Sequence, residues 1–234
     1  MLKVEALKAG YGRIPVVSDI SMEVEAGRIT AVLGANGAGK TTLVKALSGL
    51  IRPMAGRVLI AGHDITGAAP SAATRAGVRL LLDGHRVFPD LSVHDNLKIA
   101  AIATGSRREF ELLCDEYFEV FPILKQKRKD YARTLSGGQQ QILALTQAFL
   151  CQPKVLLCDE PSIGIAQALI PTILKELRNF ASRGGAVVLV EQQIQMSLKV
   201  SDTALVMDRG SIRLSGTASN LMSDERIRKI YMGN

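Results

Sequence analysis

The 234-residue sequence lacks tryptophan, has few aromatic residues, and contains no long apolar run. Its longest stretch without a charged residue, 134–153, includes five glutamines and a Gly-Gly pair, which the hydrocarbon core of a bilayer would penalise. Charges already occur at Lys3 and Glu5, so the apolar segment of a secretion signal is missing. These absences argue against a membrane span, and we expect the chain to stay in the cytoplasm unless another subunit holds it at a membrane.

Cysteine is also scarce, with three residues and no CxxC pair, a spacing that does not match a zinc cluster. Cys114 lies on an apolar helical stripe and Cys158 within a strand-like run, so we expect buried free thiols. The three histidines, His63, His85 and His94, have no metal-ligand spacing either. We expect them to be solvated or locally hydrogen-bonded.

Positive charge, in contrast, is in excess, with a formal net charge of +7. Such an excess is compatible with nucleic acid, anionic lipid headgroups or phosphate ligands as partners. The densest basic cluster, 125–133, lacks the interleaved aromatic residues of a platform that stacks bases. We therefore interpret this cluster as a solvated helix end.

The chain alternates short apolar runs, which predict strands, with amphipathic helical patterns, and this alternation predicts an α/β fold with a largely parallel sheet. Both ends of the chain look like β-hairpins or a meander, whereas 93–150 has helical patterns without a convincing strand. We expect one domain, 1–234, with an α/β core at about 1–82 and 152–234 and an inserted helical subdomain at about 83–151. The strand-like runs are 28–34, 57–62, 77–83, 153–160 and 185–191.

The segment GANGAGKTT, 34–42, follows a predicted strand and opens a predicted helix, and it matches the phosphate-loop pattern G-x-x-x-x-G-K-[ST]. Its glycines let backbone N–H groups approach phosphate oxygens, and the helix N-terminus adds positive potential. Lys40 would reach the β- and γ-phosphates, and the Thr41 hydroxyl would ligate Mg²⁺. The predicted ATP-binding residues of this loop are Gly34, Asn36, Gly37, Gly39, Lys40, Thr41 and Thr42.

Two acids end the apolar run KVLLCDE, 154–160. Asp159 at the strand end would hold Mg²⁺ through water, and Glu160 would act as the general base on the attacking water. Taken alone, the pair could be two solvated acids. Downstream of a phosphate loop it predicts hydrolysis of Mg·ATP, because that reaction needs both parts.

The segment LSGGQQQ, 135–141, resembles the signature sequence of ATP-binding cassette (ABC) ATPases, and the order of motifs along the chain is similar to that family throughout. The resemblance implies a P-loop NTPase (RecA-like) core with an N-terminal antiparallel β subdomain and an inserted α-helical subdomain. It also implies a head-to-tail dimer, in which the signature of one subunit completes the ATP site of the other, and an adenine stacked on Tyr11. The implied signature residues at ATP are Ser136, Gly137, Gly138 and Gln139.

Four further segments look like the ATP-binding subunits of branched-chain amino-acid importers: 86–97, 162–166, 189–193 and 216–233. Importers of urea and short amides remain an alternative. The resemblance implies a second cassette subunit, either a copy or a relative of this chain, two membrane permease subunits, and indirectly an external solute-binding protein. The chain would then lie at the cytoplasmic face of the cell membrane, and no nucleic-acid partner is expected.

Three positions depart from the wider family. Gln192 stands where most members have a histidine that contacts the γ-phosphate; an amide can donate a hydrogen bond there but cannot titrate. Ile165 replaces the usual acid of the segment after Glu160. Asp83, in the coupling loop LLDGHRVFPD, stands where the family has a glutamine that touches Mg²⁺, and it either ligates Mg²⁺ or only anchors the loop. We favour a retained sensing role for Asp83.

These assignments predict Lys40, Glu160 and Gln192 as catalytic residues and Thr41, Asp159 and Asp83 as Mg²⁺ ligands. Two other functions stay open. One is a soluble cassette ATPase that acts on nucleic acid or ribosomes, which the positive charge favours slightly. The other is a nucleotide-gated module without hydrolysis, which the departures at Gln192 and Asp83 keep open.

Overall fold

The computed structural model describes residues 1–82, 87–101 and 107–227. An antiparallel sheet forms the N-terminal part, with strands in the order β2-β1-β4-β5. Residues on β1 alternate between buried and exposed because one face of this sheet packs on the core and the other faces solvent. The sheet contains β1 (Leu2–Tyr11), β2 (Ile14–Val24), β4 (Ala55–Ile60) and β5 (His63–Asp64).

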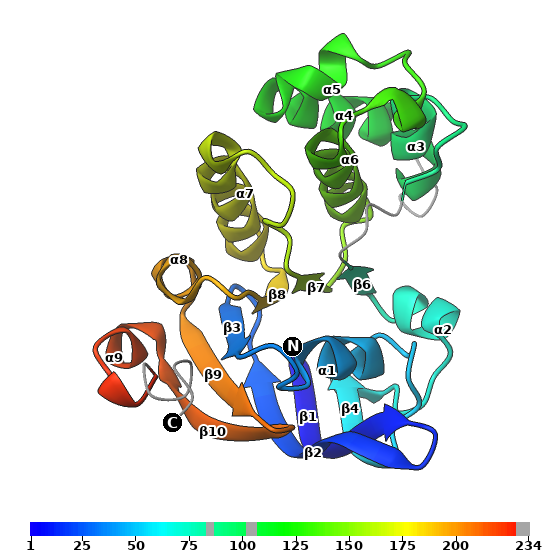
Figure 1. The fold of residues 1–234 in the computed structure, drawn as a ribbon. Helices are drawn as coiled ribbons and strands as arrows, with labels where there is room; N and C mark the ends of the chain where they lie inside the picture. Colours follow the sequence, from blue (N-terminus) through cyan, green and yellow to red (C-terminus); the bar gives the residue numbers. More distant parts are fainter. Residues whose placement is uncertain (83–86, 102–106, 228–234) are drawn as a thin grey trace.

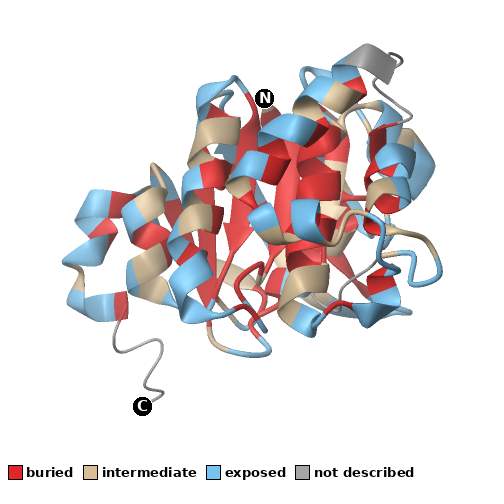
Figure 2. Ribbon diagram, turned by 90° about the horizontal axis from the view of Figure 1, so that it is seen from above, coloured by how far each residue is buried: buried red, intermediate tan, exposed pale blue. Residues whose placement is uncertain are grey.

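The second sheet is parallel except at one edge, in the order β10-β9-β3-β8-β7-β6. Within this second sheet, β9 and β10 are the antiparallel pair, and its other described pairs are parallel. Strands β3, β7 and β8 are buried over their whole length, as expected for a parallel sheet covered on both faces (Figure 2). The strands are β3 (Ile29–Gly34), β6 (Val78–Leu81), β7 (Val155–Asp159), β8 (Ala186–Val190), β9 (Thr203–Asp208) and β10 (Ser211–Thr217).

Two large apolar clusters cover the two faces of the parallel sheet. On one face, helix α1 (Lys40–Leu47) packs between the two sheets, with Leu43 and Val44 fully buried. On the other face, α7 (Ile170–Ser182) joins a cluster rich in aromatic side chains from α4 and α6. The α/β fold class with an antiparallel β part is thereby confirmed. The predicted strand at 57–62 corresponds to β4, which belongs to the antiparallel sheet and not to the parallel one.

Helices occupy the stretch between β6 and β7, in the upper part of Figure 1. No strand of either sheet occurs among the described residues of 93–150. The bounds of the inserted subdomain, about 83–151, stay a prediction. The helices between β6 and β7 are α3 (Val93–Ala100), α4 (Arg107–Val120), α5 (Pro122–Gln126), the short η2 (Ala132–Thr134) and α6 (Gly137–Leu150).

The remaining helices are short. They are α2 (Pro70–Arg75), η3 (Gln167–Leu169), α8 (Ile194–Val200) and α9 (Ala218–Met222). Over the described ranges, no helix combines the length and apolar character needed to cross a membrane.

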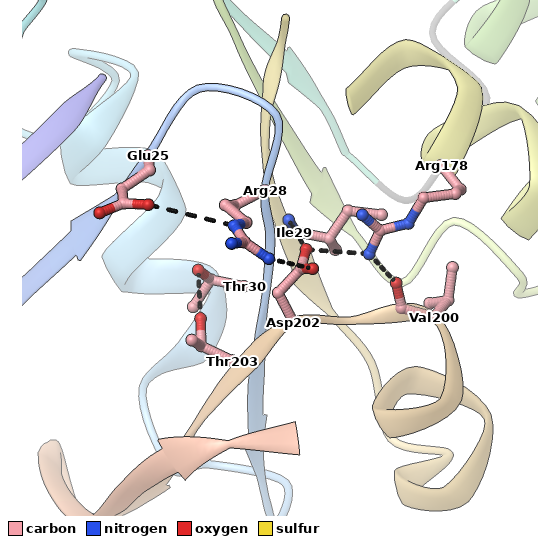
Figure 3. A network of polar contacts seen from close by, with 8 residues as sticks. All are labelled: Glu25, Arg28, Ile29, Thr30, Arg178, Val200, Asp202 and Thr203. Atoms are coloured by element: carbon pink, nitrogen blue, oxygen red, sulfur yellow. Dashed lines mark hydrogen bonds and ion pairs between the residues drawn. The ribbon is translucent and has the colours of Figure 1, made fainter. Parts of the chain in front are cut away.

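An ionic clamp at Asp202 ties the core sheet to the helices beside it (Figure 3). Its carboxylate accepts hydrogen bonds from the Ile29 backbone N–H (2.8 Å), Arg178 (2.9 Å) and Arg28 (3.0 Å). Arg178 also donates to the carbonyl of Val200. Burial acts to raise the pKa of Asp202, but the hydrogen bonds from these donors outweigh it and hold that pKa below its ordinary value.

The basic cluster 125–133 is largely neutralised by acids of the same helical region. Lys125 pairs with Glu119 and Lys127 with Asp130, while the two arginines of the cluster pair with Glu111 and Asp90. These pairs support its interpretation as a polar, solvated surface. Cys114 and Cys158 are buried free thiols, as predicted, and burial raises the pKa of Cys114 to about 12.

Candidate ATP site

The phosphate loop links the end of β3 to the start of α1. Gly39 has φ +99°, and a Cβ at this position would lie 2.8 Å from the Val17 side chain, so only glycine fits without a shift. The Lys40 ammonium donates to the carbonyls of Gly34 (2.7 Å) and Ala35 (3.1 Å). Burial lowers the pKa of Lys40, although Glu160 and Asp159 act in the opposite direction. The other predicted loop residues follow, with Asn36, Gly37 and Thr41 exposed and Thr42 buried.

Asp159 and Thr41 lie together beside this loop. Asp159 ends β7, is 4% exposed, and its Oδ1 has no hydrogen-bond partner among the described residues. Burial raises the pKa of Asp159, while a hydrogen bond from the Thr41 hydroxyl acts against this. A buried carboxylate oxygen that lacks a partner next to a hydroxyl suits a hard cation that takes oxygen ligands.

These two oxygens fit Mg²⁺ that is shared with phosphate groups, because Mg²⁺ is usually held by one or two carboxylates plus substrate phosphates and water. A cage made by the protein alone is not present in the described part of the chain, where no group of three or more acidic, histidine or cysteine side chains could hold a metal ion. Asp83, the third predicted ligand, lies outside the described residues, as does His85.

Glu160 and Gln192 meet at the carboxyl ends of two neighbouring strands. Strands β7 and β8 pair in parallel with Asp159 opposite Val190, so the residues that follow are side by side. Gln192 Nε2 donates to Glu160 Oε1 at 2.7 Å. The backbone N–H of Glu160 donates to the carbonyl oxygen of Val190 at 2.9 Å. Glu160 has φ +51°, in the left-handed region. The structure therefore brings together the predicted base and the predicted phosphate contact.

The signature residues begin helix α6. Ser136 is the N-cap: its hydroxyl accepts from the Gln139 backbone N–H, and the Gln139 side chain accepts from the Ser136 backbone N–H. The side chain of Gln139 is thus used in this capping box. Gly137 and Gly138 are the first residues of a 14-residue helix, whose N-terminus has positive potential. Figure 1 shows α6 on the opposite side of the parallel sheet from α1.

Tyr11 ends β1 with 53% of its surface exposed, so its ring is accessible for stacking, and its role at adenine stays a prediction. Of the described histidines, His63 is exposed and His94 is half-buried, with its ring 5.5 Å from that of Phe110 and Nε2 3.4 Å from Arg128. These environments agree with the expectation of solvated or locally bonded histidines.

One further residue at these strand ends is not among those predicted from the sequence. Glu191 follows β8, is 2% exposed, and accepts hydrogen bonds from Ser162. The available signal was an acid directly after a buried strand and directly before Gln192, in the segment 189–193.

The profile of the ABC transporter family matches residues 17–163, and the chain belongs to this family of transporter ATPases, which hydrolyse ATP. It is 35% identical to the high-affinity branched-chain amino acid transport ATP-binding protein BraG of Pseudomonas aeruginosa, with both chains covered completely. It is 36% identical to the probable branched-chain amino acid transport ATP-binding protein LivF of Archaeoglobus fulgidus, over all of this chain and 99% of that relative.

Another relative has a different function in its name. The lipopolysaccharide export system ATP-binding protein LptB of Haemophilus influenzae is 31% identical over all of this chain and 97% of its own. Among solved structures, an ATP-binding subunit of an ABC transporter matches with a TM-score of 0.88 at 24% identity, covering 100% of this chain and 95% of that one. This last similarity supports the fold.

Proposed function

We propose that this chain is the ATP-hydrolysing subunit of an importer for branched-chain or related amino acids. Two full-length relatives named for that transport, at 35% and 36% identity, support the substrate class. The hydrolytic role rests on one observation above all: the 2.7 Å hydrogen bond that joins Gln192 to Glu160 at the strand end next to Asp159.

The proposed roles at the phosphates follow from the loop geometry. The backbone of 34–42 and the N-terminus of α1 would bind the phosphate oxygens, with Lys40 as the fixed positive charge. Thr41 and Asp159 would hold Mg²⁺, which when bound offsets the negative charge of the phosphate groups. Asp83 is proposed as a further contact, and Tyr11 as the stacking partner of adenine.

Glu160 is proposed as the general base that takes a proton from the attacking water. Because Gln192 donates to Oε1 of Glu160, the amide fixes the orientation of the carboxylate. An amide cannot exchange a proton in the physiological range, so Glu160 has to accept the proton without help from residue 192.

The proposed assembly contains two cassette subunits and two membrane permeases at the cytoplasmic face of the membrane, with an external solute-binding protein. The separation of α1 and α6 across the parallel sheet supports a dimer in which Ser136, Gly137 and Gly138 face the ATP of the other subunit (Figure 1). The bonded side chain of Gln139 then contributes indirectly, through the capping box that it forms with Ser136 at the helix N-terminus.

An ATPase assay of Glu160→Gln tests the catalytic part. We expect turnover to fall by about 100-fold or more, because loss of a general base typically costs 10²–10⁴ in rate. Glu176→Gln is the matched control, since Glu176 is a buried glutamate on α7 that accepts a hydrogen bond from the Asn179 side chain. Wild-type turnover in Glu160→Gln would contradict the assignment.

A second candidate function is lipopolysaccharide export, which the 31% identity to LptB favours. The two candidates differ in their membrane partners. Co-purification of the chain with its permeases from native membranes, followed by assays of amino-acid uptake and of lipopolysaccharide release, separates them.

A further inference from the structure

Glu191 is a buried carboxylate that bridges the ends of β7 and β8. Its Oε1 accepts from the Ser162 hydroxyl at 2.6 Å and from the Ser162 backbone N–H at 3.2 Å. Its Oε2 accepts from the backbone N–H of Gln192 at 3.3 Å. Burial raises the pKa of Glu191, and the bonds from Ser162 and Gln192 act against that rise. One side chain therefore contacts the segment after Glu160 and also the backbone of Gln192.

This position is costly for a charged group. A carboxylate with 2% exposure loses its hydration and has to be satisfied by hydrogen-bond donors inside the protein. The short bond from Ser162 is of the strong, charge-assisted kind. An apolar residue would fill the same space without the cost of desolvation. We therefore attribute the carboxylate to the positions of Ser162 and the Gln192 backbone, which it fixes by hydrogen bonds.

The geometry that it fixes is that of the proposed base. Glu160 lies two residues before Ser162 and has φ +51°, a backbone conformation that a glutamate keeps only when its surroundings hold it. Two anchors flank it: its own N–H bonded to Val190, and Ser162 bonded to Glu191. The Gln192 side chain that donates to Glu160 is attached to the backbone that Glu191 also holds.

The anchored segment also touches the signature helix. A Cβ added at Gly138 would lie 2.8 Å from the carbonyl oxygen of Gly164, so the two backbones are in close approach. Gln141 donates to the carbonyl of Pro161 at 3.5 Å. A displacement of the segment 161–165 would therefore move both Glu160 and the start of α6.

We propose that Glu191 is a positioning residue for ATP hydrolysis: by binding Ser162 and the backbone of Gln192, it holds the Glu160–Gln192 pair in its hydrogen-bonded arrangement. The inference rests on the proposed function, because it takes Glu160 as the base and Gln192 as its partner. Glu191 acts in this proposal through its contacts with Ser162 and the Gln192 backbone.

Steady-state ATP hydrolysis and ATP binding by the purified full chain test the proposal with three variants. Glu191→Ala removes all three bonds, and we expect kcat to fall about tenfold to 100-fold, since small misplacements of a reacting group cost up to that much. KM for ATP should stay within about twofold, because the phosphate loop is untouched. Glu191→Gln keeps an oxygen that can accept both Ser162 bonds, but its NH2 group cannot accept from the Gln192 N–H, so it should restore only part of the lost kcat.

Ser162→Ala is the reciprocal variant. It should lower kcat in the same direction, and adding it to Glu191→Ala should cause little further loss, because both changes break the same contact. Glu176→Ala is the matched control: it deletes another buried carboxylate, one on α7 that accepts from Asn179 at 2.9 Å, and it should leave kcat unchanged.

If Glu160→Gln is inactive, the proposed base stands, and either of two results would then overturn the positioning role of Glu191. In one, kcat of Glu191→Ala equals that of Glu176→Ala. In the other, Glu191→Gln is as slow as Glu191→Ala. Wild-type turnover in Glu160→Gln would instead overturn the proposed base, and with it the pair that Glu191 is inferred to position.

Discussion

At the scale of single residues, the hydrogen bond from Gln192 to Glu160 gives the active site a donor that does not titrate. A histidine at this position would have an ordinary pKa of about 6.5 and would change its charge between pH 5 and 8. In this chain, residue 192 cannot contribute such a change. The pH dependence of hydrolysis then reflects other groups.

Gln192→His tests this difference. We expect turnover of the variant to change through about pH 6–7, where the imidazole titrates. The wild type should show no change in turnover that comes from titration of residue 192. A pH–rate profile of both proteins measures it. Superimposable profiles would contradict a direct contact of residue 192 with the reacting groups.

Motifs of fixed spacing could be predicted from the sequence, whereas contacts that depend on strand pairing or burial could not. The phosphate loop, Asp159 and Glu160 could be located because each motif has fixed spacing relative to a strand end. The bond between Gln192 and Glu160 joins residues 32 positions apart, and it depends on the pairing of β7 with β8. Glu191 was not found because burial makes it different from a solvated acid, and burial is a property of the packed sheet.

At the scale of secondary-structure elements, the Asp202 clamp joins β3, α7 and the turn between α8 and β9 (Figure 3). The donors at Asp202 hold its pKa below the ordinary value. Its contribution to stability is therefore fully present above the unfolded pKa of about 3.9 and is lost as pH falls through the lower, folded pKa.

Asp202→Asn should lower the free energy of unfolding at pH 7 by about 2 kcal/mol, since it removes hydrogen bonds to a charged acceptor. The difference between wild type and variant should shrink as the pH falls below about 4. Urea denaturation at several pH values measures both effects.

Asp208→Asn is the matched control for this clamp, because Asp208 pairs with Arg213 at 3.8 Å on the surface, where ion pairs contribute at most about 1 kcal/mol. An equal loss in both variants, or a loss in Asp202→Asn that does not depend on pH, would contradict the account of the clamp.

Elements could be predicted from the sequence to different extents. The fully buried strands β3, β7 and β8 appear as mostly apolar runs, so their location could be predicted. The run at 57–62 has the same local character, yet β4 belongs to the antiparallel sheet, because its partner is β1 at the far N-terminus. Sheet membership depends on such long-range pairing, which local periodicity does not encode.

At the scale of the whole molecule, the two halves of the proposed ATP chemistry lie on different sides of the parallel sheet. Helix α1 with the phosphate loop packs between the two sheets, while α6 with the signature lies among the helices between β6 and β7 (Figure 1). This separation agrees with a subunit that works in a pair. The segment 161–165, close to Gly138 and anchored by Glu191, links the two regions within one chain.

We propose that hydrolysis at Glu160 powers the import of branched-chain amino acids. Uptake of radiolabelled leucine into proteoliposomes tests it most directly, with the permeases and binding protein reconstituted alongside either the wild-type chain or Glu160→Gln. We predict ATP-dependent uptake with the wild-type chain, and uptake reduced about 100-fold or more with the variant, in line with the loss of a general base. Equal uptake with both chains, or no leucine uptake with an active wild-type ATPase, would contradict the account.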